Sequence, residues 1–113
     1  MKKRVLAFAC VLCVLLSVPI YAATKKVYVP DLSFNGTTAN CYIYIYEAGK
    51  NIDITLELWH GGTLVHSWSD NRTTQVIINE YSPVVSGYTY TLLVTGTIGG
   101  VPINCTPITD TCP

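Results

Sequence analysis

Charge is scarce in this chain. Asp, Glu, Lys and Arg together make up 12% of the 113 residues, and three of the seven basic residues fall within the first four positions. Beyond residue 23, four basic residues oppose seven acidic ones, which gives a net charge of −3. Binding to nucleic acid or to an anionic membrane surface relies on clustered Lys and Arg. The composition therefore argues against both kinds of partner.

Side chains that commonly carry catalysis or bind metals are also few. His60 and His66 are the only histidines, and the three cysteines after residue 23 have no Cys-x-x-Cys spacing. A metal site built on the two histidines would need further ligands from elsewhere. No motif places a base beside a nucleophile. We therefore expect no catalytic residue, no metal site and no cofactor, and hence no enzyme.

The one long apolar run lies at the N-terminus. It covers residues 5–20, after a basic start and before an alanine pair. This is the pattern of a secretory signal peptide, whereas a spanning helix usually needs about 20 apolar residues. An uncleaved membrane anchor is the alternative, but the small residues favour cleavage after Ala22 or Ala23. We expect residues 1–23 to be a bacterial-type signal peptide and residues 24–113 to form one secreted domain, held at a cell surface only through binding.

The remaining sequence has the period of β-strands. Aliphatic residues alternate with Asp53, Thr55 and Glu57, which predicts one buried and one exposed face for residues 52–59. Gly61-Gly62 then supplies a tight hairpin, because glycine reaches the positive φ values of primed turns.

Other segments have the same character, and a polar turn is expected at residues 70–72. Pro102 and Pro107 cannot donate to a ladder, so the last strand is expected at a sheet edge. The result is an all-β fold of about seven short antiparallel strands in a sandwich or barrel. Besides residues 52–59, the expected strands are 26–29, 38–46, 64–69, 74–79, 88–97 and 101–108.

One stretch narrows the choice of architecture. Residues 84–92, Val-Val-Ser-Gly-Tyr-Thr-Tyr-Thr-Leu, place a glycine turn before Tyr90 on an alternating strand. This resembles the corner before the sixth strand of immunoglobulin-like and fibronectin type III domains, and the resemblance implies such a sandwich. The Tyr90 ring can be buried while its hydroxyl returns to nearby backbone. Leu92 stands where the immunoglobulin pattern has a cysteine. The domain also resembles small secreted bacterial β-sandwich proteins of unknown function.

Three cysteines follow the predicted signal peptide: Cys41, Cys105 and Cys112. In an exported protein they are disulfide candidates, and an odd number leaves one unpaired. All three pairings are open. The alternative is that all three are reduced, with Cys41 a small core residue.

A row of tyrosines is the most suggestive surface feature. If Cys41 and the isoleucines after it face the core, Tyr42, Tyr44 and Tyr46 stand on the outer face about 7 Å apart. Gln75 and Asn79 can supply amides beside them, which completes an apolar floor with polar edges for a glycan. The alternative needs no ligand, since tyrosine favours strands and packs across them.

Trp59 is a further candidate for ligand binding, because it flanks the glycine hairpin and an aromatic ring there can anchor a partner protein. Packing over the sheet end is the alternative. Taken together, the sequence predicts a secreted noncatalytic module that binds an extracellular protein or glycan. Self-association through edge strands is the alternative, and a hydrolase or its accessory is the least favoured class.

Overall fold

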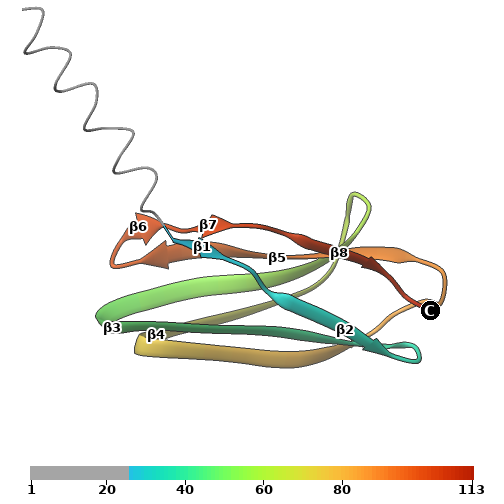
Figure 1. Ribbon diagram of the computed structural model, residues 1–113, viewed down its shortest axis with the longest axis horizontal. Helices are drawn as coiled ribbons and strands as arrows, with labels where there is room; N and C mark the ends of the chain where they lie inside the picture. The colour runs from blue at the N-terminus through green and yellow to red at the C-terminus, as the bar shows by residue number, and fades with distance from the viewer. Residues whose placement is uncertain (1–25) are drawn as a thin grey trace, which may run out of the picture.

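A computed structural model describes residues 26–113, and the predicted signal peptide lies outside this range. The described part is all β and contains no helix, so none that could cross a membrane. Its strands, shown in Figure 1, are β1 (Val27–Tyr28), β2 (Asp31–Asn35), β3 (Thr38–His60), β4 (Thr63–Pro83), β5 (Thr89–Ile98), β6 (Val101–Pro102), β7 (Asn104–Cys105) and β8 (Ile108–Thr111).

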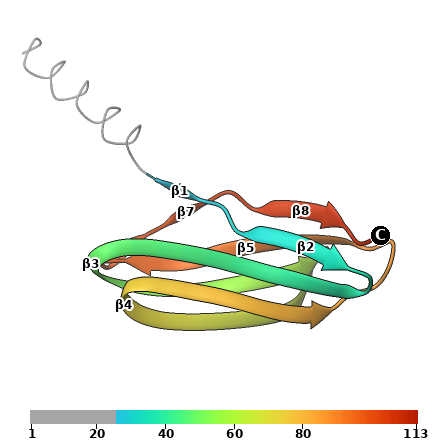
Figure 2. The same ribbon diagram turned by 60° about the horizontal axis from the view of Figure 1, so that its bottom comes forward.

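The β3–β4 hairpin forms the frame of the domain. The two strands pair antiparallel from Thr38–Pro83 to His60–Thr63, and Gly61-Gly62 makes the predicted turn. Near mid-length the pairing passes from Glu47–Thr74 to Asn51–Thr73, so residues 48–50 of β3 have no partner on β4. The extra residues bend the hairpin, and both strands turn back on themselves at one end of the molecule (Figures 1 and 2).

Folding the hairpin back creates two layers. The first half of β3 pairs with β2 and with the second half of β4, which gives a layer of three strands. The second half of β3 pairs with the first half of β4 and with β5. Beyond β5, the short strands β6 and β8 complete the second layer, and Figure 2 shows the two layers facing each other.

The core lies between these layers, and alternation along the strands explains it. Ile43 and Ile45 of the first layer are buried, as are Ile52 and Leu56 of the second, while Tyr44 between the first pair is exposed. Each such aliphatic side chain contributes about 1.5–3 kcal/mol on burial. The buried core consists of Leu32, Ala39, Cys41, Ile43, Ile45, Ile52, Ile54, Leu56, Leu58, Val76, Ile78, Val84, Tyr90, Leu92, Val94 and Cys112.

The corner between β4 and β5 has the predicted form. The ring of Tyr90 is buried next to Phe34, at a centroid distance of 6.2 Å. Its hydroxyl oxygen accepts a hydrogen bond of 2.8 Å from the backbone N–H of Val85. One side chain therefore fills the core and fixes the chain that leads into β5.

Several sequence-based boundaries were wrong. The expected turn at residues 70–72 lies inside β4, which bends instead at Thr73 and Thr74. β2 was not predicted, although Leu32 is in the core. The last expected strand, residues 101–108, is broken after Pro102 and at Pro107, which leaves β6, β7 and only the first residue of β8 within it. One pairing, between β1 and β7, is parallel.

The expected disulfide is absent: Cys41, Cys105 and Cys112 are all free thiols. Each contacts a different part of the fold. Cys41 faces the core from β3, Cys105 Sγ accepts the N–H of Val94 at 3.3 Å, and Cys112 Sγ donates to the carbonyl of Gly36 at 3.3 Å. The thiols act as small packing groups within residues 26–113.

Candidate functional site

The outer face of the three-stranded layer carries an exposed group of large apolar side chains. The exposed fractions are 48% for Tyr44, 55% for Tyr46, 54% for Ile77 and 64% for Tyr81. Tyr42 lies on the same face and is half-buried. We call this surface the tyrosine face, and with its polar members it consists of Asn40, Tyr42, Tyr44, Tyr46, Gln75, Ile77, Asn79 and Tyr81.

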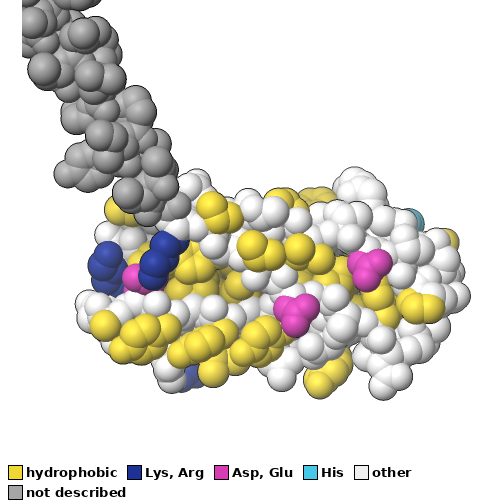
Figure 3. All heavy atoms as spheres, viewed as in Figure 1, with side chains coloured by type: hydrophobic (Ala, Val, Ile, Leu, Met, Phe, Trp, Pro, Cys, Tyr) yellow, Lys and Arg dark blue, Asp and Glu magenta, His cyan; other side chains and the backbone are white. Residues whose placement is uncertain are grey.

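The register of β3 with β4 brings these residues together. Tyr44 lies opposite Ile77, and directly opposed residues in an antiparallel pair share a face. The same register pairs Tyr46 with Gln75, Tyr42 with Asn79 and Asn40 with Tyr81. Four cross-strand pairs therefore form one continuous surface. Rows of apolar side chains along the region of β3 and β4 are visible at the lower border of Figure 3.

Amide groups hold the polar part of this surface in place. Asn40 Nδ2 donates to Asn79 Oδ1 at 2.8 Å, and the Tyr44 hydroxyl lies 3.5 Å from Gln75 Oε1. Each amide still has hydrogen-bonding groups to spare, because an Asn or Gln side chain offers two donors and one acceptor oxygen. The face thus combines aromatic rings with positioned hydrogen-bonding groups.

The predicted set of site residues is therefore brought together except for Trp59. Trp59 lies on the outer face of the second layer, beside Thr91 of β5 and Leu64 of β4. It is half-buried, and its Nε1 donates to Glu57 Oε1 at 3.4 Å. Trp59 packs on its own sheet and does not extend the tyrosine face.

Tyr81 was not predicted as a member of the tyrosine face. The expected strand ended at residue 79, whereas β4 continues to Pro83 with the same alternation. Tyr81 continues the series of Gln75, Ile77 and Asn79, so extending the period of two by one step would have identified it.

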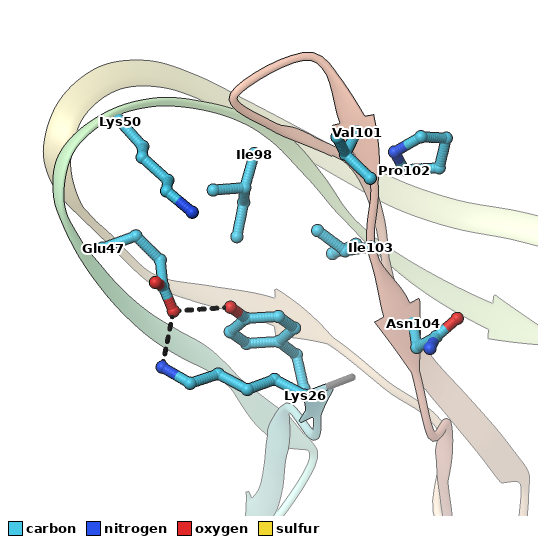
Figure 4. A pocket seen from close by; sticks show the side chains of 9 residues that line it. Lys26, Glu47, Lys50, Ile98, Val101, Pro102, Ile103 and Asn104 are labelled. Carbon is cyan, nitrogen blue, oxygen red and sulfur yellow. Dashed lines mark hydrogen bonds and ion pairs between the residues drawn. The ribbon is translucent and has the colours of Figure 1, made fainter. Parts of the chain in front are cut away.

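A pocket of about 320 Å³ lies at the end of the sandwich where β3 bends, and Figure 4 shows it from close by. One side is polar and comes from Lys26, Tyr28, Glu47 and Lys50. The other is mainly apolar and is formed by Ile98, Val101, Pro102, Ile103 and Asn104. The residues come from β1 and the residue before it, from the bend of β3 and from the region of β5 to β7, which are far apart in the sequence.

Glu47 organises the polar side. Its Oε2 accepts hydrogen bonds of 2.8 Å from both Lys26 Nζ and the Tyr28 hydroxyl. Hydrogen bonding to Lys26 and Tyr28 holds the pKa of Glu47 below its ordinary value. Burial, together with the bond to Glu47, raises the pKa of Tyr28 to about 12. Glu47 is thus ionised and Tyr28 neutral at ordinary pH.

The histidines are engaged with aromatic rings. His60 stacks on Tyr88 at a centroid distance of 4.3 Å, and His66 stacks on Trp68 at 5.4 Å. His66 lies opposite Leu58, so the two histidines do not meet across the hairpin. Among residues 26–113, no group of three His, Cys, Asp or Glu side chains is arranged to hold a metal ion.

Comparison with known proteins gives no further guide. The chain matches no protein-family model, and no similar curated protein is found.

Proposed function

We propose that the protein is a secreted, noncatalytic binding module that recognises an extracellular glycan through the tyrosine face. The observation that carries the proposal is the concentration of exposed aromatic rings, with amides between them, on one sheet surface. These rings expose apolar area to water, and large exposed apolar patches commonly mark interaction sites.

The strand order supports an immunoglobulin-like or fibronectin-like architecture for this module. A layer of β2, β3 and β4 faces a layer of β4, β3, β5 and the last strands. Two facing antiparallel layers, with the buried Tyr90 bonded to the backbone at the corner before β5, are what such an architecture would have. Such folds carry many functions, so the proposed activity depends on the surface and not on the architecture.

A glycan suits the chemistry of the tyrosine face. Adjacent exposed tyrosines on β3 lie two residues apart, about 7 Å, and the strands are about 4.8 Å apart. Rings at this spacing offer apolar surface to the C–H faces of consecutive sugar units, while Asn79 and Gln75 offer amides to hydroxyl groups. None of the eight residues of the tyrosine face is charged, although the exposed Asp31 of β2 lies directly opposite Tyr42 at its border.

The test is a glycan array with polysaccharide pull-downs, using the mature chain from Thr24. The Tyr42→Ala/Tyr44→Ala double variant should lose binding. Tyr88→Ala is the matched control, because Tyr88 is 44% exposed, close to the 48% of Tyr44, and lies outside the face. Equal binding by both variants, or silence across the array, would reject glycan recognition. Capture of a protein that depends on Tyr44 would assign the face to a protein partner instead.

Self-association is the second candidate, favoured by the edge that β4 leaves open. Within residues 26–113, β4 pairs only with β3, so the other side of its 21 residues has no partner strand. Unpaired strand edges are templates for pairing with another chain. Two copies paired antiparallel about Ile77 would set Val76 against Ile78 and Gln75 against Asn79, with no like charges opposed.

Sedimentation over a wide range of protein concentration tests this second candidate. Ile77→Lys would place two ammonium groups opposite each other and should abolish concentration-dependent association. Val85→Lys is the control, since Val85 is also exposed but lies outside β4. A monomer at all concentrations, or association that Ile77→Lys leaves intact, would exclude pairing through this edge.

A further inference from the structure

The pocket at the bend of β3 is separate from the tyrosine face and has its own chemistry. Figure 4 shows the Lys50 and Glu47 side chains reaching into it from one side and Ile103 on the other, with Ile98 between Lys50 and Ile103. Its volume of about 320 Å³ lies at the lower end of the range for small-molecule sites. A polar wall opposite an apolar wall favours a ligand that has both characters.

The two walls are fastened to each other by backbone hydrogen bonds. Gly99 N–H donates to the carbonyl of Asn51 at 2.8 Å, which joins the β5–β6 turn to the bend of β3. Thr106 N–H donates to the carbonyl of Tyr28 at 3.0 Å, which joins the chain after β7 to β1, and Ile103 N–H donates to the carbonyl of Gly96 at 3.0 Å within the apolar wall. The pocket is therefore already formed in the free protein, so a ligand need not order its walls on binding.

The charges on the polar wall are unbalanced. Lys26 and Lys50 oppose the single carboxylate of Glu47, which gives the wall a net charge of +1. Glu47 is satisfied by Lys26 and Tyr28, and its side chain is only 17% exposed. Lys50 forms no ion pair with any residue in the range 26–113. The ammonium group available to a ligand is thus that of Lys50.

We propose that this pocket binds a small amphipathic organic anion, with its carboxylate on Lys50 and its hydrocarbon part against Ile98, Val101 and Ile103. The lysine supplies a point charge with several donors for the carboxylate. The aliphatic wall removes the hydrocarbon from water at about 25 cal/mol per Å². The net charge of +1 on the polar wall balances one anionic group, so the site favours a monoanion.

Titration of isotope-labelled protein, followed by amide chemical shifts, tests the site. The probes are decanoate below its aggregation concentration, acetate, and decyltrimethylammonium. Decanoate should shift the amides of Val101, Ile103 and Asn104 saturably. Acetate lacks the chain and decyltrimethylammonium carries the opposite charge, so both should leave these amides unchanged. Equal shifts with decyltrimethylammonium would show adsorption of any hydrocarbon chain and overturn the proposal.

Variants test the contribution of each wall to decanoate binding separately. Lys50→Met keeps the aliphatic stem and should weaken decanoate binding at least tenfold, and Lys50→Gln should do the same. Val101→Ser should weaken it several-fold. Arg72→Met is the control, because Arg72 is an exposed cation outside the pocket and its loss should change nothing. Unchanged affinity in both Lys50 variants would overturn the proposal. None of these residues belongs to the tyrosine face, so either proposal can fail alone.

Discussion

The hydroxyl oxygen of Tyr90 accepts the backbone N–H of Val85 across 2.8 Å, and this bond ties the start of β5 to the loop before it. Tyr90→Phe keeps the buried ring but leaves the Val85 donor without this partner. We expect a loss of about 1 kcal/mol in the free energy of unfolding, measured by urea denaturation. An unchanged midpoint would mean that water replaces the hydroxyl at no cost and that the corner does not stabilise the fold.

Truncation of two adjacent residues of β3 should change the free energy of unfolding by very different amounts. Tyr44→Ala removes a half-exposed ring and should change the free energy of unfolding by no more than about 0.5 kcal/mol. Ile43→Ala removes a buried side chain and should cost about 2–5 kcal/mol. Thermal melts of the two variants give the comparison. A loss of several degrees in Tyr44→Ala would show that the ring supports the fold, which would weaken its assignment to ligand binding.

Gly96 allows the close approach of β5 to β3. Its φ of +136° is rare for other residues, and a Cβ at this position would collide with the carbonyl oxygen of Asp53. Gly96→Ala should therefore destabilise the protein by at least about 2 kcal/mol. Gly62→Ala is the comparison, because a Cβ there meets open space. Similar melting temperatures for the two variants would contradict this packing.

The contact between Tyr28 and Glu47 predicts a loss of stability in alkali. Since folding raises the pKa of Tyr28 from 10.0 to about 12, the protonated phenol stabilises the folded state fully below pH 10. This contribution declines as pH rises from 10 through 12, because the phenol ionises in the unfolded chain while the folded protein still holds the proton. Urea denaturation at pH 8, 10 and 11 measures the free energy of unfolding of the wild type and of Tyr28→Phe. The difference in favour of the wild type should shrink as the pH rises. A constant difference would exclude the linkage.

Thiol labelling should distinguish the cysteines. Burial raises the pKa of Cys41 to about 11, so its thiolate is scarce at neutral pH. Cys105 is only half-buried. Alkylation of the folded protein followed by peptide mass spectrometry should modify Cys105 first and Cys41 only after denaturation. Early labelling of Cys41 would indicate that the first layer opens readily.

Local alternation made much of this fold predictable. The buried and exposed faces of residues 52–59, the glycine hairpin and the outward position of Tyr44 follow from a period of two. The boundaries of β4 did not follow, because Asp70, Asn71 and Arg72 have the composition of a turn. Their pairing with residues 52–54 of β3 keeps them in a strand, and the extra residues 48–50 move the bend elsewhere.

The pocket could not have been predicted in the same way. Its polar wall joins Lys26 and Tyr28 to Glu47, about twenty positions later, and its apolar wall begins at Ile98. No local pattern links these segments, because only the bend of β3 and the parallel pairing of β1 with β7 bring them together. The tyrosine face, by contrast, depends on two strands whose alternation is visible in the sequence.

The folded-back hairpin also determines how errors of pairing would spread. A slip of one residue between β3 and β4 exchanges the inward and outward sides of every residue beyond it. Because the same two strands run through both layers, such a slip at Gly61-Gly62 would bury Tyr44 and Tyr46 and expose isoleucines in the opposite layer as well.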